Sequence, residues 1–204
     1  MRSVNAVVLV PVKAFTDAKA RLATVLGNTE RERLARWTAA RVLAAAGELP
    51  TYVACDDEQV AAWALEHGAA ILWHPGVGLN AAVTDSVAEL RDAGVTDVIV
   101  AHGDLPRAHS LAALSEPGTV TLVPDRHGDG TNVVALPTNL DFQFAYGPGS
   151  FQRHLASAIA SGHAVRVRRD PLLAADIDTP ADLAHPLVQE VLPSWLQTNQ
   201  ANQR

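Results

Sequence analysis

Three aspartates carry the strongest chemical signal in this sequence. Asp104 follows an apolar run that ends at Ala101, and Asp176 and Asp178 stand two residues apart in the segment ADID. Residues i and i+2 of an extended chain face the same side, so these last two carboxylates point together. Convergent carboxylates repel each other unless a cation lies between them. Three oxygen ligands without a nearby cysteine therefore indicate a site for Mg²⁺, or alternatively Mn²⁺, rather than for zinc.

Each aspartate taken alone has a simpler interpretation. Asp104 lies in the segment HGDLP, where its side chain could serve only the turn. Asp178 could instead cap a helix that begins at Thr179-Pro180. His102 of the same HGDLP segment is typical of a packing or turn residue rather than of a metal ligand. The metal hypothesis therefore depends on the three carboxylates coming together.

Lysine occurs only twice in the chain, at Lys13 and Lys19, and every other basic residue, including the nearby Arg21, is arginine. Lys13 directly follows the first predicted strand, so its ammonium can reach over the carboxyl edge of a sheet. Lysine is a compact point charge that suits phosphate oxygens. Lys13, Lys19 and Arg21 together indicate an anion site. For Lys13 taken alone, an ordinary surface lysine is an equally good interpretation.

Three glycine-rich segments add candidate ligand contacts. GVGLNA (76–81) fits the dinucleotide pattern G-x-G-x-x-A but follows the third predicted strand, so we interpret it as a turn that admits a ligand's backbone or base. DRHGDGTN (125–132) and YGPGSF (146–151) follow later, and the second opens a helix at Ser150. Backbone amides and a hydroxyl at a helix N-terminus can bind an anion. The alternative is that these glycines and prolines only shape loops.

Metal carboxylates, lysine charges and amide-lined loops together predict phosphoryl or nucleotidyl transfer. The sequence contains no evident Ser-His or Cys-His nucleophile, no Walker loop and no zinc-protease motif. A phosphate monoester carries nearly two negative charges at neutral pH and can attack without a general base. The protein then has to align the reactants and neutralise charge.

Composition narrows the class of protein. The chain has 204 residues, 48% hydrophobic and 19% charged, with a formal net charge of −6. This acidic balance argues against a nucleic-acid partner. The single cysteine, Cys55, cannot form an internal disulfide, and the apolar run 4–12 is too short to span a bilayer. We therefore expect a cytoplasmic protein that does not insert in a membrane.

Alternating hydrophobic patterns predict an α/β fold. The expected strands are 4–12, 51–55, 69–72, 95–101, 119–124, 131–136 and 165–167; the expected helices are 29–46, 57–67, 79–93, 108–114, 150–161 and one opened by Thr179-Pro180. Thr29 and Glu32 predict a capping box for the first helix. The early strands lack a polar face, which indicates a mostly parallel sheet covered on both sides. Ligands bind beyond the carboxyl ends of such strands, which places Lys13, GVGLN and HGD on one rim.

Five segments together resemble a known family. PVKAFTDAKARLA, HGDLP, DRHGDGTN, YGPGSF and DIDTPADL occur in order between about residues 8 and 185. They resemble the 2-phospho-L-lactate guanylyltransferase family, which includes the phosphoenolpyruvate guanylyltransferases of coenzyme F-420 biosynthesis. The resemblance implies a three-layer nucleotidyltransferase fold similar to glycosyltransferase type A proteins. We expect one such domain over residues 1–190 and a polar, frayed tail over 191–204.

The resemblance also implies roles for individual residues. The Mg²⁺ ligands would be Asp104, Asp176 and Asp178. The residues that meet the phosphates of GTP would be Lys13, Lys19 and Arg21. The residues that lie by the guanosine would be Gly78 and Asn80. The residues that cradle phosphoenolpyruvate would be Thr131, Gly147 and Ser150. Lys13 and Asp104 would act in catalysis, and the products would be enolpyruvyl-diphospho-guanosine and pyrophosphate.

Two positions depart from the family pattern, and several alternatives stay open. Ala14 stands where proline is common after Lys13, and Asp129 adds a carboxylate to a loop proposed to hold an anion, so we expect its side chain to point away. The acceptor could also be 2-phospho-L-lactate or 3-phosphoglycerate. A non-catalytic nucleotide-binding module and a dinucleotide oxidoreductase are the rival classes. A homodimer is left open, and a partner enzyme would consume the labile product.

Overall fold

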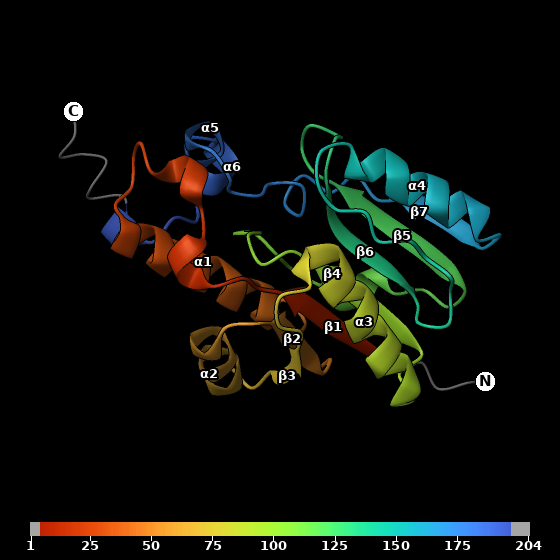
Figure 1. The fold of residues 1–204 in the computed structure, drawn as a ribbon. Helices are drawn as coiled ribbons and strands as arrows, with labels where there is room; N and C mark the ends of the chain where they lie inside the picture. The colour runs from red at the N-terminus through yellow and green to blue at the C-terminus, as the bar shows by residue number, and fades with distance from the viewer. Residues whose placement is uncertain (1–4, 197–204) are drawn as a thin grey trace.

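A computed structural model describes residues 5–196 of the protein. Seven strands of this part form one sheet in the order β3-β2-β1-β4-β6-β5-β7 (Figure 1). Their bounds are β1 Ala6–Pro11, β2 Thr51–Cys55, β3 Ala70–Trp73, β4 Asp97–Ala101, β5 Thr119–Pro124, β6 Thr131–Pro137 and β7 Ala164–Val167. Only β6 runs antiparallel to its neighbours in this sheet, so the prediction of a mostly parallel α/β fold is confirmed.

The central strand β1 explains why the sheet is covered on both faces. Val8 and Val10 belong to one buried cluster, and Val7 and Leu9 belong to another. Alternate residues of a strand point to opposite faces, so an uninterrupted apolar run buries both. The result is a three-layer molecule with the sheet in the middle.

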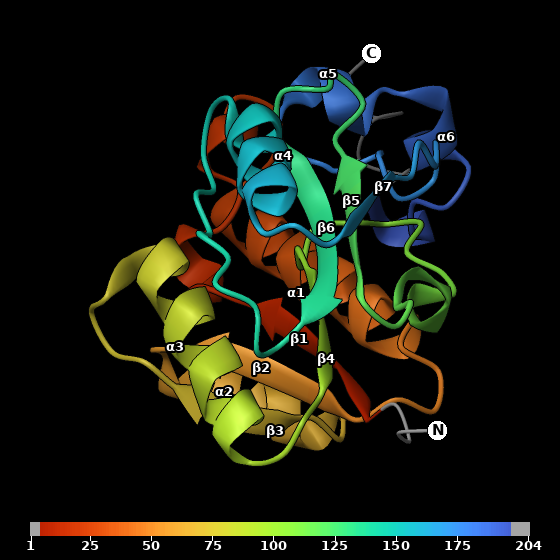
Figure 2. The same cartoon turned by 90° about the vertical axis from the view of Figure 1, so that its right-hand side faces the viewer.

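Each cluster identifies the helices that cover one face. Helices α1 (Asn28–Ala44) and α2 (Glu58–Glu66) pack with the 3₁₀ turn η3 (Leu111–Leu114) on the face of Val8. Helices α3 (Gly78–Asp92) and α4 (Ser150–Ala160) cover the face of Val7. Figure 2 shows α3 and α4 on one side of the sheet and α1 on the other.

The start of α1 differs from the prediction. Gly27 is the N-cap, and its amide donates to Glu30 Oε2 at 2.8 Å. The capping box predicted from Thr29 and Glu32 is therefore wrong, because the helix begins at Asn28 and Glu30 already satisfies the first amide. The helix predicted over 108–114 is also shorter, a single 3₁₀ turn at Leu111–Leu114.

A third buried cluster holds the C-terminal segment against the start of the chain. It joins Leu22, Leu26 and Leu34 to the short helices α5 (Pro180–Leu183) and α6 (Pro186–Gln189) and to the side chains of Leu192 and Leu196. The chain predicted as a tail from residue 191 thus packs against the protein as far as Leu196, whereas 197–204 lie outside the described residues. The domain boundary at 190 stays a prediction. Over residues 5–196, no helix has both the length and the apolar character needed to cross a membrane.

Candidate active site

A cleft of about 690 Å³ opens at the carboxyl ends of β1, β2 and β4. Its lining includes Lys13 after β1, Gly76 and Gly78 before α3, and His102 and Asp104 after β4. The prediction that these three loops share one rim is therefore confirmed. The parallel arrangement of the three strands brings residues distant in sequence to this edge.

The three predicted carboxylates meet beside this cleft. One carboxylate oxygen from each of Asp104, Asp176 and Asp178 lies within 4.8 Å of the others. The amide of Ile177 donates to the backbone oxygen of Asp104 at 3.2 Å, which ties the two segments together. Ile177 is fully buried, so the aspartates on either side of it face the same way.

Asp178 does not cap the helix that follows it. Thr179 is the N-cap of α5, and its hydroxyl accepts from the amide of Asp182 at 3.3 Å. The carboxylate of Asp182 accepts in return from the amides of Asp178 and Thr179, at 3.0 and 2.7 Å. Asp182 is itself paired with Arg126. The capping alternative for Asp178 is therefore wrong, and its carboxylate is left to face the cluster.

Lys19 lies between two of these carboxylates. Its Nζ is 3.0 Å from Asp104 Oδ2 and 3.2 Å from Asp178 Oδ1, and its side chain is only 7% exposed. Burial acts to lower the pKa of Lys19, but the two carboxylates outweigh burial, so the pKa is raised. Lys19 takes a left-handed backbone conformation, with φ of 57°, just before the 3₁₀ turn Ala20–Leu22. The ammonium thus partly neutralises the acidic cluster.

The remaining carboxylate atoms fit a divalent cation. Among residues 5–196, Asp104 Oδ1 is a buried oxygen for which no hydrogen-bond partner is found. Burial, followed by the charges of Asp104 and Asp178, raises the pKa of Asp176 to about 7. A buried carboxylate oxygen without a hydrogen-bond partner and a carboxyl group with a raised pKa both indicate negative charge that Lys19 does not fully balance. A bound hard cation would balance this charge. All donors are carboxylate oxygens, which suits Mg²⁺ or Mn²⁺.

The other two predicted cationic residues, Lys13 and Arg21, are exposed to solvent. Lys13 is exposed and lines the cleft together with Asp104. Arg21 is exposed within the turn Ala20–Leu22 and is not among the residues that line the cleft. Lys13 is therefore better placed than Arg21 to meet an anion there.

Of the two residues predicted beside the guanosine, only Gly78 lines the cleft. Gly78 lines the cleft and has φ of 76°, a conformation that favours glycine. Asn80 instead ties α3 to the loop 146–151: its Oδ1 accepts from the Tyr146 amide at 2.7 Å, and its Nδ2 donates to the Tyr146 oxygen at 3.4 Å. Asn80 is not among the cleft-lining residues. Its predicted contact with guanosine stays a prediction.

Hydrogen bonds within the first glycine loop, and one between the two glycine loops, occupy several of the loop amides. The Asp125 carboxylate accepts from the amides of His127, Asp129 and Gly130 at 2.9–3.0 Å. Asp129 Oδ2 accepts from the Gly149 amide at 2.9 Å. The expectation that Asp129 points away is therefore wrong, because its carboxylate reaches across to the second loop. These amides are already satisfied, so an anion held here has fewer amides available than the sequence suggested.

The three residues predicted to hold the acid lie in or next to these two loops, and none of them is among the residues that line the cleft. Thr131 opens β6, Ser150 opens α4 and is buried, and Gly147 lies between them in the second loop with φ of 119°. Sequence reasoning missed His154, whose Nδ1 lies 3.0 Å from Thr131 Oγ1. The sequence could have indicated His154, because Ser150 and His154 are four residues apart and therefore face the same side of α4.

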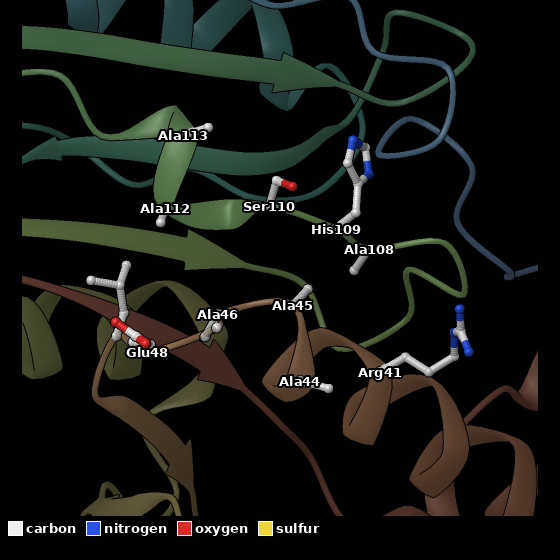
Figure 3. Close-up of a pocket in the computed structure, with 12 residues that line it drawn as sticks. Arg41, Ala44, Ala45, Ala46, Glu48, Ala108, His109, Ser110, Ala112 and Ala113 are labelled. Atoms are coloured by element: carbon white, nitrogen blue, oxygen red, sulfur yellow. The ribbon is translucent and has the colours of Figure 1, made fainter.

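A second hollow, of about 770 Å³, lies between the end of α1 and the segment 108–113. Figure 3 shows that alanine side chains form much of its wall, with the side chains of Arg41 and His109 near one end. None of the residues predicted from the sequence to do chemistry lines it. The carboxylate cleft is therefore the better candidate for the active site.

Comparison with known proteins decides the family. Residues 6–190 match the family model described as guanylyl transferase CofC like. The chain belongs to this guanylyltransferase family. The relatives include proteins named phosphoenolpyruvate guanylyltransferase from Sphaerobacter thermophilus and Mycolicibacterium gilvum. The first is 37% identical over 87% of this chain and 90% of its own. The second is 33% identical over 86% of each chain.

Solved structures agree on the fold. A Desulfovibrio desulfuricans protein described as a nucleotide-diphospho-sugar transferase superposes with a TM-score of 0.72 and 16% identity, covering 98% of this chain and 96% of its own. A 4-diphosphocytidyl-2C-methyl-D-erythritol synthase gives 0.61 and 14% identity, over 94% and 100% of the two chains. The predicted nucleotidyltransferase fold is confirmed, and this CofC-like protein is a nucleotidyltransferase.

Proposed function

We propose that this guanylyltransferase joins GMP from GTP to phosphoenolpyruvate, giving enolpyruvyl-diphospho-5′-guanosine and pyrophosphate. The observation that carries the proposal is the cluster of Asp104, Asp176 and Asp178 beside a cleft that Lys13 also lines. The names of relatives at 31–37% identity support the choice of guanosine nucleotide and of acid. The proposed place of the reaction is coenzyme F-420 biosynthesis in the cytoplasm.

The proposed step is one in-line displacement at phosphorus. A phosphate oxygen of phosphoenolpyruvate forms a bond to the α-phosphorus of GTP, and the bond from that phosphorus to the β-bridging oxygen breaks, so pyrophosphate leaves with the electron pair. The attacking phosphate is already an anion, so no protein base has to remove a proton. The enzyme therefore acts by alignment and by charge stabilisation.

The protein groups divide this work. Asp104, Asp176 and Asp178 would hold Mg²⁺, or Mn²⁺ in its place, and the bound ion would neutralise charge on the triphosphate. Lys13, exposed on the cleft, would meet the phosphates of GTP, with Lys19 and Arg21 as further candidates. Gly78 would let the nucleotide approach the chain closely, with Asn80 nearby. Thr131, Gly147 and Ser150 would hold the acid beside the glycine loops.

Pyrophosphate release tests this proposal directly. GTP, ATP and CTP are each combined with phosphoenolpyruvate, 2-phospho-L-lactate and 3-phosphoglycerate in the presence of Mg²⁺. The expected result is release with GTP and phosphoenolpyruvate, increased when an enzyme that consumes the labile product is added. Release only with another acid would replace the substrate and keep the reaction. GTP binding without release in any combination would support a non-catalytic nucleotide-binding module.

A further inference from the structure

His154 is enclosed on the inner side of α4. The residue is fully buried. The rings of Phe142, Phe144 and Tyr146 surround its imidazole, at centroid distances of 5.6, 6.4 and 4.8 Å. Such an apolar enclosure disfavours a charged imidazole, and burial lowers the pKa of His154 to about 4. The imidazole is therefore neutral at physiological pH and carries one ring hydrogen.

The neighbours of the ring decide which nitrogen carries that hydrogen. The backbone amide of Ala145 lies 2.9 Å from Nε2, and an amide can only donate. Nε2 must therefore be the acceptor, which leaves the hydrogen on Nδ1. Nδ1 lies 3.0 Å from the hydroxyl oxygen of Thr131, so Nδ1–H donates to that oxygen.

This bond determines where the hydroxyl hydrogen of Thr131 can point. Because its oxygen accepts from His154, its own hydrogen must point to a different group. Within residues 5–196 we find no protein acceptor for that hydrogen. Thr131 is only 3% exposed, and a buried hydroxyl hydrogen favours an acceptor strongly.

Thr131 stands at the edge of the sheet where the active site lies. Strand β6 is antiparallel to β4, so its first residue lies beside the last residues of β4. The His102 amide donates to the Asn132 oxygen at 3.0 Å, one residue from Thr131. The Tyr146 ring contacts both His102 and His154, at centroid distances of 4.7 and 4.8 Å. The His154–Thr131 pair is therefore next to the loop that carries Asp104.

We propose that His154 is a positioning residue, which directs the hydroxyl hydrogen of Thr131 toward an anionic oxygen of the phosphorylated acid. This inference rests on the proposed function, because it takes Thr131 to contact the acid. A hydroxyl that could rotate freely would present its lone pairs to the anion for part of the time. Held by His154, it presents only its hydrogen, which favours a charge-assisted hydrogen bond.

Two substitutions separate the two nitrogens of the ring. In His154→Asn the side-chain amide can place an N–H near Nδ1, which keeps the bond to Thr131. In His154→Gln the side-chain oxygen can lie near Nε2, which keeps the bond from Ala145 and loses the bond to Thr131. Thr131→Val removes the hydroxyl at nearly constant volume. Circular dichroism and thermal unfolding establish that each variant is folded before kinetics are compared.

The expected pattern is a specific loss of affinity for the acid. His154→Gln and Thr131→Val should each raise the KM for phosphoenolpyruvate about tenfold, with kcat and the KM for GTP little changed. The double variant should be no worse than Thr131→Val alone, because both changes remove the same donor. His154→Asn should restore most of the affinity. Losses that multiply in the double variant, or a folded His154→Asn protein as impaired as His154→Gln, would overturn the inference.

One further measurement needs no turnover. The ¹⁵N chemical shifts of the His154 ring at pH 7 report which nitrogen is protonated. A neutral ring with its hydrogen on Nδ1 supports the inference, whereas Nε2–H or an imidazolium overturns it. A wild-type protein that shows this tautomer but releases no pyrophosphate would contradict the proposed function while leaving the His154–Thr131 arrangement intact.

Discussion

The Lys19 ammonium lies 3.0 Å from Asp104 Oδ2, although 85 residues separate the two in the chain. The same ammonium contacts Asp178, so it serves two of the three clustered carboxylates. A buried carboxylate is costly unless a cation balances it. Lys19 therefore supplies part of the positive charge that keeps the acidic cluster folded, and a bound divalent ion would supply the rest.

Replacing Lys19 by methionine should destabilise the metal-free protein. The change keeps much of the side-chain volume but leaves the largely buried Asp104 carboxylate without its cation. We expect a loss of about 3 kcal/mol in the free energy of unfolding, measured by chemical denaturation with EDTA. Mg²⁺ should then stabilise the variant more than the wild type, because the ion binds without competition from the ammonium.

Lys13→Met is the matched control, since Lys13 is the only other lysine and is exposed in the same cleft. It should leave the free energy of unfolding nearly unchanged and reduce turnover. Equal stability losses for the two variants would show that the Lys19 contacts do not stabilise the cluster.

Asp176 should make the stability of the metal-free protein depend on pH. Its pKa is raised to about 7 in the folded state, so between the ordinary carboxyl pKa and pH 7 the folded state binds more protons than the unfolded state. Stability from this group therefore falls as pH rises through that window. Asp176→Asn removes the effect. Relative to wild type, the variant should gain about 2 kcal/mol between pH 4 and pH 8, allowing for solvent screening.

The comparison between variant and wild type is needed because other groups titrate in the same range. The lowered pKa of His154 makes stability rise between about pH 4 and the ordinary histidine pKa, which opposes the effect of Asp176. Asp85→Asn, an exposed change on α3, serves as the control. A stability difference between Asp176→Asn and wild type that stays constant with pH would contradict the raised pKa.

Gly130 should not tolerate alanine. A Cβ at this position would lie 2.7 Å from Asp125 Oδ2, the atom that accepts from the Gly130 amide. The carboxylate would have to move and release the amides that close the first glycine loop. We expect Gly130→Ala to lower the free energy of unfolding by about 2 kcal/mol and to raise the KM for the acid more than that for GTP.

His127→Ala in the same loop should change little, because only the backbone amide of His127 bonds to Asp125. Unfolding and kinetics are measured for both variants under the same conditions. If Gly130→Ala left the free energy of unfolding and both KM values unchanged, the bonds to Asp125 would not determine the conformation of the loop.

Asn80→Asp tests the connection between α3 and the loop 146–151. The carboxylate could still accept from the Tyr146 amide, but its second oxygen would face the Tyr146 carbonyl, to which Asn80 Nδ2 now donates. Replacing a donor by an acceptor should cost about 1–2 kcal/mol of stability, seen as a lowered Tm. Asp85→Asn, an exposed change further along α3, is the control. An unchanged Tm for Asn80→Asp would show that the bridge contributes nothing.

The features that depend on hydrophobic pattern were predictable from the sequence. The run from Ala6 to Pro11 is apolar at every position, so it had to be a strand buried on both faces. Once the strands were parallel, their carboxyl ends placed Lys13 and Asp104 on one rim. Asp176 and Asp178 converge because Ile177 between them is buried, which follows from extended-chain geometry alone.

The contacts that depend on the conformation of individual side chains were not predictable from the sequence. Lys19 reaches Asp104 because its backbone is left-handed, and no pattern in the sequence requires that conformation of a lysine. Asp125 and Asp129 look like ordinary loop residues, yet their carboxylates bond to amides up to 20 residues away. The N-cap of α1 is Gly27, two residues before the predicted Thr29, because Glu30, rather than Glu32, reaches the free amide.

The fate of the GTP phosphates tests the proposed reaction most directly. The protein is incubated with Mg²⁺, phosphoenolpyruvate and GTP labelled at the α-phosphorus or at the γ-phosphorus, and the labelled products are separated. We expect the α-label in a diphosphate-linked compound of phosphoenolpyruvate and the γ-label in pyrophosphate, with neither product formed by folded Asp104→Asn. Release of the γ-label as orthophosphate, or transfer that persists undiminished in Asp104→Asn, would contradict guanylyl transfer at this carboxylate cluster.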